Sequence, residues 1–190
     1  IQAYPPGVRE SGGQYSHAGV WALMAEAQAE HPHQLTPGVA SAGDTVYRYF
    51  TYLSPAHRAA HPTRGAVYGI EPYAMAGDVY SQPPYVGRGG WSWYTGAAAW
   101  LHRAAIESLF GPQPAAQGLC CPPCLPAHWP QAGLTLRREG RVLRFTLVRS
   151  TAAQVALAPG ERLLRPGERL LWAGLAADSR CVVPLLADGP

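Results

Sequence analysis

The sequence predicts an α+β protein in which a helical first half precedes a second half built from β-strands. All 10 Tyr, four of the six Trp and two of the three Phe lie before Gly111. The segment 92–110 is rich in Ala and Leu, whereas apolar and polar residues alternate between Arg141 and Val148, as in a strand. Gly111 and the following proline end the helical half, because Gly adopts the left-handed conformation after a helix and Pro cannot continue one. The expected domains are 1–111 and 134–190, joined by a connecting loop over 112–133.

Four helices are expected in the first half, over 14–30, 41–53, 72–80 and 92–110. The first is apolar on most sides, as expected of a helix packed within a bundle. Ser41 and Asp44 resemble a capping box, with Asp in place of Glu, at the start of the second. Pro72 is expected at the first position of the third, and Ser92 at the N-cap of the fourth.

Turn residues divide the second half into short strands. Glu139-Gly140 lies between the segments 134–138 and 141–149 and predicts a hairpin. The hexapeptide Pro-Gly-Glu-Arg-Leu-Leu occurs at 159–164 and again at 166–171. Pro-Gly pairs favour type II turns, so we expect two turns of a β-sandwich and not a solenoid. A basic stripe is expected to be a solvated strand face and consists of Arg137, Arg138, Arg141, Arg144 and Arg149.

Composition excludes several classes of protein. A net charge of +3 is too small to indicate a nucleic-acid partner. No apolar run of about 18 residues is present, so no membrane span is expected in this stretch. The start carries no basic segment followed by an apolar one, so no signal peptide is expected either. The chain is therefore expected to be cytoplasmic.

The four cysteines are too few for a disulfide scaffold. Cys121 and Cys124 have the spacing of half a zinc or redox site, and His128 makes a three-ligand set conceivable. A structural zinc site needs four ligands, and the remaining distant cysteine is Cys181. We therefore expect no metal, and reduced, partly buried thiols in a proline-rich loop.

The glycine-rich segment 86–96 leads into a predicted helix and suggests an anion site. The first amides of a helix have no intrahelical acceptor, and the helix dipole adds a partial positive charge. Glycines allow an anion to approach the backbone closely. Thr95 and Gly96 offer a hydroxyl and an amide there, and Arg88 adds charge. The alternative is a turn whose glycines serve only close helix packing.

His17 follows Gly12-Gly13 at the start of the first predicted helix. A ring N–H of such a histidine can hydrogen-bond an anion, or the ring can simply be satisfied by the backbone. Four aromatic residues near the glycine-rich segment could stack on the apolar faces of sugars or belong to the core: Tyr73, Trp91, Trp93 and Tyr94.

These stretches together resemble glycoside hydrolase family 94, the inverting carbohydrate phosphorylases, and in particular the phosphorylase-like domain of cyclic β-1,2-glucan synthases. The resemblance rests on YPPGVRESGGQYSHAGVWALM (4–24), GIEPYAMAGDVYSQPPYVGRGGWSWYTGAAAW (69–100), CPPCLPAHWP (121–130) and VPLLADG (183–189). It implies the last helices of an (α/α)₆ barrel followed by a C-terminal antiparallel β-sandwich. It also implies a chain truncated at both ends, whose partner is the upstream remainder of its own barrel.

In the family, inorganic phosphate attacks the anomeric carbon while an Asp protonates the leaving oxygen. The resemblance implies that His17, Thr95 and Gly96 bind the phosphate. The residues that it places at the sugar site or cleft wall are Arg9, Glu10, Gln14, Glu71, Tyr73 and Trp93. The implied ligands are a β-linked glucan or oligosaccharide, inorganic phosphate and glucose 1-phosphate, with no other cofactor.

The chain departs from the family at several positions. The general-acid Asp belongs to a Trp-Asn-Asp type motif, which does not occur here, so we expect it upstream and assign no catalytic residue to this chain. Disaccharide phosphorylases carry Gln where Gly77 stands, which favours the β-1,2-glucan branch. The Pro- and Gly-containing stretch 31–42 replaces a helix hairpin.

The expected function is therefore that of the C-terminal part of a carbohydrate phosphorylase or cyclic β-1,2-glucan synthase, a glycosyl-transferring enzyme. It would lie at the bacterial inner membrane if the parent is a full cyclic glucan synthase. The isolated chain is expected to be inactive, since it lacks the acid. Two alternatives stay open: a non-catalytic carbohydrate-binding module that uses Trp91, Trp93 and Tyr94, and a structural remnant whose aromatic residues only pack.

Overall fold

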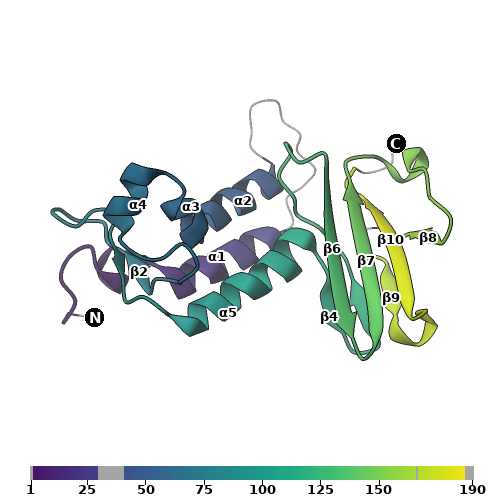
Figure 1. The fold of residues 1–190 in the computed structure, drawn as a ribbon, viewed down its shortest axis with the longest axis horizontal. Coiled ribbons are helices and arrows are strands. Elements are labelled where there is room, and N and C mark those ends of the chain that lie inside the picture. The colour runs from purple at the N-terminus through teal and green to yellow at the C-terminus, as the bar shows by residue number, and fades with distance from the viewer. Residues whose placement is uncertain (1, 30–40, 166, 187–190) are drawn as a thin grey trace. The chain divides into compact units, whose positions relative to one another are not determined.

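The computed structural model describes residues 2–29, 41–165 and 167–186. The chain divides into two compact units between Ala105 and Ile106, within the predicted first domain. The first unit is mainly helical and the second is built from β-sheets (Figure 1), so the α+β class is confirmed. Most of the stretch 31–42, singled out in the sequence, lies outside the described residues.

The first unit contains helices and a small sheet. Its helices are α1 (Ser16–Gln28), α2 (Ala42–Leu53), α3 (Pro55–Ala59), α4 (Pro62–Tyr68) and α5 (Thr95–Ala104), preceded by the 3₁₀ turn η1 (Arg9–Ser11). Its strands are β1 (Gln14–Tyr15), β2 (Asp78–Val79) and β3 (Gly89–Gly90), in the order β1-β2-β3. The sheet is short, but it joins β1 to a pair of strands that follow it by more than sixty residues.

Helix α1 packs between α2 and α5, as the ribbon shows (Figure 1). Val20 and Leu23 of α1 and Leu101 of α5 are buried in this layer. Gly19 permits the close approach of α2, since a Cβ there would lie 2.8 Å from Leu53 Cδ2. Val20 and Leu23 are one turn apart and share one face of α1, whereas the apolar Trp21 and Ala22 are exposed, so the helix is apolar beyond the face that it buries.

The helix starts were predicted with mixed success. Ser41 caps α2 in a full capping box with Asp44, which confirms that prediction. The helix predicted from Pro72 is wrong: residues 74–79 form a buried extended segment that ends in β2. Ser92 is not an N-cap either, since α5 begins at Thr95 behind Tyr94. Helices α3 and α4 were missed, although each starts with a proline at its first turn.

The π-helical turn η2 (Ala105–Phe110) leads into the second unit, whose described residues form two sheets. One has the order β6-β7-β10-β8 and consists of β6 (Gln131–Arg138), β7 (Arg141–Val148), β10 (Asp178–Pro184) and β8 (Glu161–Leu163). The other has the order β4-β5-β9 and consists of β4 (Gln113–Ala115), β5 (Gly118–Cys120) and β9 (Arg169–Leu171). The predicted connecting loop 112–133 therefore contains the hairpin β4–β5 and the start of β6.

The predicted hairpin is confirmed: Arg138 pairs with Arg141, and Glu139 and Gly140 both have positive φ. Two such residues form the tight turn that matches the twist of paired strands. The two copies of the repeated hexapeptide diverge. The first contributes β8 to the four-stranded sheet, whereas the second contributes β9 to the three-stranded sheet.

The pairing of β10 corrects the expectation of a purely antiparallel domain. Strand β10 runs parallel to both β7 and β8, so the four-stranded sheet is mixed. Alternation of apolar residues identified β7, where Leu143, Phe145 and Leu147 are buried. It carries no information on strand direction, because a strand presents the same face to the core in either direction.

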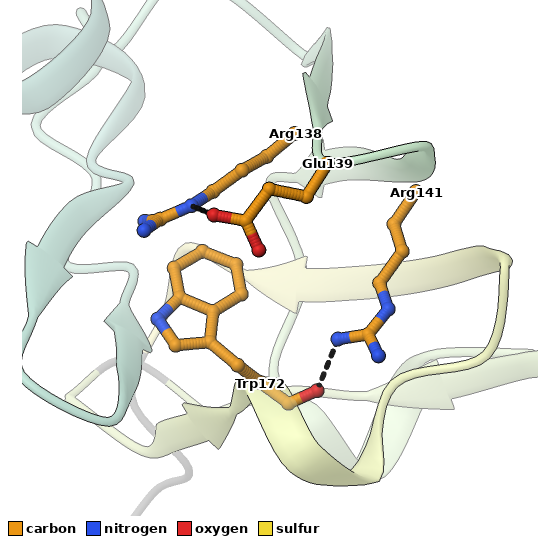
Figure 2. Close-up of polar contacts among 4 residues, drawn as sticks. All are labelled: Arg138, Glu139, Arg141 and Trp172. Carbon is orange, nitrogen blue, oxygen red and sulfur yellow. Dashed lines mark hydrogen bonds and ion pairs between the residues drawn. The ribbon is translucent and has the colours of Figure 1, made fainter.

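Four arginines of the stripe lie on β6 and β7 and Arg149 follows β7; Arg141 and Arg149 are half-buried, so the stripe is only partly solvated. Arg144 forms an exposed ion pair with Asp178, at 3.3 Å. Figure 2 shows a second cluster, in which Arg138 lies over the Trp172 ring at 4.7 Å and Arg141 donates to the Trp172 carbonyl at 2.8 Å. Arg149 donates to two backbone carbonyls. Arg141 and Arg149 therefore hold non-strand backbone, at Trp172 and at 126–129, next to the sheet.

Candidate functional site

Two of the stretches that carry the family resemblance, 4–24 and 69–100, meet in the small sheet of the first unit. Tyr15 of β1 pairs with Asp78 of β2, which pairs with Gly90 of β3. The Ser16 N–H donates to the Gly77 carbonyl, which fixes the start of α1 against the middle strand. Residues that are more than seventy positions apart in sequence thereby share one surface, as the predicted site requires.

Gly90 is required by close packing at the centre of this sheet. A Cβ on Gly90 would lie 2.5 Å from Asp78 Oδ1 and 2.6 Å from the Tyr80 hydroxyl. Both distances are far below van der Waals contact, so any side chain here would displace a buried neighbour. The glycine-rich turn therefore serves packing at this position, one of the two alternatives that the sequence left open.

The chain after β3 adopts an unusual conformation. Trp91 and Trp93 have φ of 59° and 61°, in the left-handed region that bulky residues avoid. Such backbone strain is maintained only where surrounding contacts hold it, and it clusters at functional sites. Here the Tyr94 N–H donates to the Met75 carbonyl at 2.8 Å and anchors the end of the segment. The conformation of residues 91–94 places Thr95 and Gly96 at the first positions of α5.

His17 lies directly beside the N-terminus of α5. A Cβ built on Gly96 would lie 3.8 Å from His17 Cε1 and 4.0 Å from Nδ1. The opening amides of α5 have no intrahelical acceptor and carry the positive end of the helix dipole. His17 Nε2 is buried and has no hydrogen-bond partner among the described residues. An imidazole nitrogen and helix-start amides thus meet at one place.

Aromatic rings fix the imidazole of His17. Trp21, one turn later on α1, meets it edge-on with ring centroids 4.9 Å apart, and Trp100 of α5 lies at 6.2 Å. The two indoles contact each other at 5.8 Å. Gly96 and Trp100 are one turn apart on α5, just as His17 and Trp21 are on α1. The contacts with Trp21 and Trp100 hold the histidine ring in a defined orientation.

Arg9 occupies an aromatic cage next to this histidine. Its guanidinium lies 4.2 Å from the Trp91 ring centroid and donates hydrogen bonds to the hydroxyls of Tyr4 and Tyr94, at 3.0 and 3.1 Å. The Tyr94 hydroxyl also contacts the Tyr15 hydroxyl at 3.0 Å. This hydrogen bond raises the pKa of Tyr15 above that of an ordinary tyrosine. The cage links Arg9 to the residue that precedes Thr95.

The buried Asp78 holds the backbone of Arg9, the residue at the centre of the cage. Its side chain is 1% exposed, and its Oδ2 accepts a hydrogen bond from the Arg9 N–H at 2.7 Å. Burial raises the pKa of this carboxyl above its ordinary value, since a charged group loses solvation there. Asp78 Oδ1 has no partner among the described residues. Sequence reasoning missed its role, because nothing near an isolated Asp reveals burial.

The other predicted substrate residues are spread over the unit. Gln14 does not face His17; it is bonded to the Tyr52 carbonyl and to Arg58. Glu10 and Glu71 are exposed. Tyr73 and Trp93 are also exposed and form an edge-on pair with centroids 6.0 Å apart. The structure therefore brings together His17, Gly96, Thr95 and Arg9, with Tyr73 and Trp93 as a separate pair.

Sequence reasoning also missed two caging residues, Tyr4 and Tyr15. The signal was present, because both are aromatic residues that flank the Arg9 segment within a stretch already singled out. Which rings pack on the guanidinium depends on the chain reversal at η1, where Arg9 itself has φ of 46°. That conformation is unusual for arginine and could not be read from the sequence.

Neither metal ligands nor a membrane span are evident over 2–29, 41–165 and 167–186. No three His, Cys, Asp or Glu side chains gather there as a metal site would require. No helix in these ranges combines the length and apolarity needed to cross a bilayer. All four cysteines are free thiols, and burial raises the pKa of Cys121 to about 12.

Comparison with known proteins gives a consistent picture. The cyclic β-(1,2)-glucan synthase NdvB of Rhizobium meliloti (strain 1021) is 38% identical over 151 residues, which is 80% of this chain and 5% of that protein. The solabiose phosphorylase of Paenibacillus borealis is 26% identical over 83% of this chain and 19% of its own length. The N,N′-diacetylchitobiose phosphorylase of Vibrio proteolyticus is 28% identical over 71% of this chain and 15% of its own length.

The chain thus spans less than a fifth of each of these relatives. The family model described as the glycosyl hydrolase 94 superfamily, catalytic domain, matches residues 1–111. That range includes His17, Arg9, Thr95 and Gly96, and it is more than half of the 190 residues. On this evidence the resemblance seen in the sequence is confirmed, and the chain belongs to the glycosyl hydrolase 94 superfamily.

Proposed function

We propose that this chain supplies the phosphate-binding part of the active site of a glycosyl-transferring enzyme that acts on β-linked glucosides. Its parent either phosphorolyses an oligosaccharide or processes a β-1,2-glucan. The helical unit belongs to an (α/α)₆ barrel and the second unit to a β-sandwich domain in this proposal. The names of the relatives support the enzyme class, and NdvB favours the glucan branch.

One observation carries the proposal: His17 faces the N-terminus of α5. The Nδ1–Cε1 edge of its imidazole lies against Gly96, which has no side chain of its own, while the buried Nε2 has no partner among the described residues. A phosphate oxygen would accept from an imidazole N–H and from the amides at the start of α5. The Thr95 hydroxyl, exposed at the same end, adds a third donor. Since the dipole favours negative charge there, the site suits a phosphate ion.

The chemistry follows from that placement. Phosphate is already an anion, so the enzyme has to position it against the anomeric carbon and need not deprotonate it. As the phosphate oxygen forms its bond to carbon, the glycosidic C–O bond breaks and the leaving oxygen takes a proton from a general acid. We assign no general acid to residues 1–190. Glucose 1-phosphate is the product that this reaction predicts.

The Arg9 guanidinium is already engaged by the hydroxyls of Tyr4 and Tyr94. In this proposal it steers the sugar through the cage it organises, and Trp93 with Tyr73 forms an outer wall for the glucan. Glu10, Gln14 and Glu71 remain proposed cleft residues. The cellular location, in the cytoplasm or at the bacterial inner membrane, also stays a prediction.

Phosphate-dependent release of glucose 1-phosphate tests the proposal in the full-length protein. His17→Ala is expected to weaken phosphate binding by about ten- to a hundredfold, the effect of losing one or two hydrogen bonds to a charged ligand. Thr95→Val should weaken it less, by about tenfold. The isolated 190 residues are expected to release none. Unchanged phosphate affinity in His17→Ala, with the fold intact by circular dichroism, contradicts the proposal.

The exposed pair of Tyr73 and Trp93 favours a second candidate, a carbohydrate-binding module. Trp91 is less suited to it, since one face of its ring lies against Arg9. Calorimetry separates the two functions. Glucan binding that is independent of phosphate and unaffected by His17→Ala supports the module.

A further inference from the structure

The first unit contains a pocket of about 570 Å³ that is distinct from the candidate site. Its lining comes from the end of α2, from α3 and α4, and from residues 86–87. None of the residues that meet at the start of α5 lines it. Its volume falls within the range of pockets that hold small organic ligands.

The lining of this pocket is basic. Arg58, Arg64 and His57 contribute to it, whereas no Asp or Glu of the described chain does. Neither arginine forms an ion pair with a described residue. Burial lowers the pKa of the Arg58 guanidinium, and the like charge of Arg64 acts in the same direction. An anion bound in this pocket would relieve the repulsion between the two guanidinium groups.

The guanidinium of Arg58 is held in place before any ligand binds. Its Nε donates to the Tyr52 carbonyl at 2.8 Å, and its Nη2 donates to Gln14 Oε1 at 2.7 Å. Its third nitrogen, Nη1, has no partner among the described residues. A side chain that is already ordered loses little conformational entropy when a ligand binds to it. Arg58 is thus a preorganised donor for an anion.

The rest of the lining offers apolar surface. Tyr52, Val67 and Val86 line the pocket and are 52%, 49% and 53% exposed, so their side chains are available to a ligand. A bare inorganic anion would fill only a small part of 570 Å³ and would leave these side chains without contact. The pocket therefore suits a ligand that joins an anionic group to an organic body.

We infer that this pocket binds a phosphate monoester, with the phosphoryl group on Arg58 and Arg64 and the organic body against Val67 and Val86. A phosphate monoester carries a charge of about −1.5 to −2 at neutral pH and three acceptor oxygens, so it matches two guanidinium groups better than a carboxylate does. Sugar phosphates and nucleotides share this chemistry, and the experiment distinguishes them. The inference does not depend on the proposed function, because the pocket and the site at His17 have no residue in common.

Calorimetry on the full-length protein tests the inference with glucose 1-phosphate, adenosine 5′-monophosphate and inorganic phosphate. The background is His17→Ala, which weakens the phosphate site proposed at α5. At least one of the two esters is expected to bind in this background, and more tightly than inorganic phosphate. Arg64→Gln should weaken that binding about ten- to a hundredfold, the effect of losing hydrogen bonds to a charged ligand. The ester that binds more tightly identifies the organic body as a sugar or a nucleoside.

Arg48→Gln is the matched control, since Arg48 is exposed on α2 in the same unit and does not line the pocket. Arg64→Lys keeps the charge but loses the paired donors, so it should bind the ester with intermediate affinity. The inference is overturned if neither ester binds, if Arg48→Gln and Arg64→Gln weaken binding equally, or if inorganic phosphate binds as tightly as both esters. These results leave the proposed function standing. Failure of His17→Ala to affect phosphate counts against the proposed function instead.

Discussion

The Arg9 N–H donates a hydrogen bond to Asp78 Oδ2 at 2.7 Å, and this contact joins the stretch 4–24 to the stretch 69–100. Arg9 has φ of 46°, so its backbone N–H points to the middle strand while its guanidinium enters the aromatic cage. A buried acceptor at this position stabilises a conformation that arginine rarely adopts.

Replacement of Asp78 tests how the burial of its carboxyl group makes the stability of the fold depend on pH. The pKa of Asp78 is raised above 3.8, because burial disfavours the carboxylate. The folded state thus holds the proton more tightly than the unfolded state, and stability is lost as pH rises from the unfolded pKa through the raised folded pKa. Asp78→Asn should abolish that part of the pH dependence, measured by urea denaturation between about pH 3 and 7. An unchanged pH profile contradicts this account.

Gly96→Ala separates folding from ligand binding. The new methyl would lie 3.8 Å from His17 Cε1, an ordinary contact, and alanine favours a helix over glycine by about 1 kcal/mol in helix interiors. The variant should melt at the same or a higher temperature. Because the methyl occupies the space between imidazole and helix start, phosphate affinity should fall by at least tenfold. Calorimetry with inorganic phosphate measures this affinity. If the variant binds phosphate as tightly as the unaltered protein, the phosphate site does not lie between His17 and the start of α5.

Gly90→Ala should instead destabilise the fold. Its Cβ would lie 2.5 Å from Asp78 Oδ1, and the overpacking is expected to cost about 1–3 kcal/mol. Gly133→Ala in β6 is the matched control, since its Cβ would meet only the Phe145 carbonyl, at 3.7 Å. The midpoint of chemical denaturation measures both. Equal stability of the two variants would refute the packing role of Gly90.

The thiols should react in a defined order. Burial raises the pKa of Cys121 to about 12, so its thiolate is scarce at pH 8. Cys181 is also buried, whereas Cys120 and Cys124 are half-buried. Iodoacetamide followed by mass spectrometry should label Cys120 and Cys124 before the other two, and all four in guanidinium. Early labelling of Cys121 in the native protein contradicts its burial.

The sequence predicted the elements that local signals specify. The capping box at Ser41 and the turn at Glu139-Gly140 are short-range devices whose residues act within a few positions. The segment after Pro72 was mistaken for a helix because its conformation depends on remote partners, the carbonyls of Gly90 and Trp91 that accept from Gly77. The direction of β10 depends on its neighbours in the same way.

The residues of the candidate site also differ in whether local sequence signals or long-range packing determine them. His17, Thr95 and Gly96 were indicated by motif and by helix-start chemistry, and they lie together. Asp78 and the phenol of Tyr15 were not indicated, because burial and ring packing arise only when β1, β2 and β3 meet. Gln14 was predicted from a family position, but its side chain is bonded to Arg58.

Strand β10 has a consequence for how the chain folds during synthesis. It lies between β7 and β8, so β8 cannot join the sheet until residues 178–184 have left the ribosome. Strands β6 and β7 can pair earlier as a hairpin, but one edge of β7 stays open to other chains in the meantime. A nascent chain stalled before Asp178 would therefore be the aggregation-prone species, while helices of the first unit, which depend on earlier residues, are already complete.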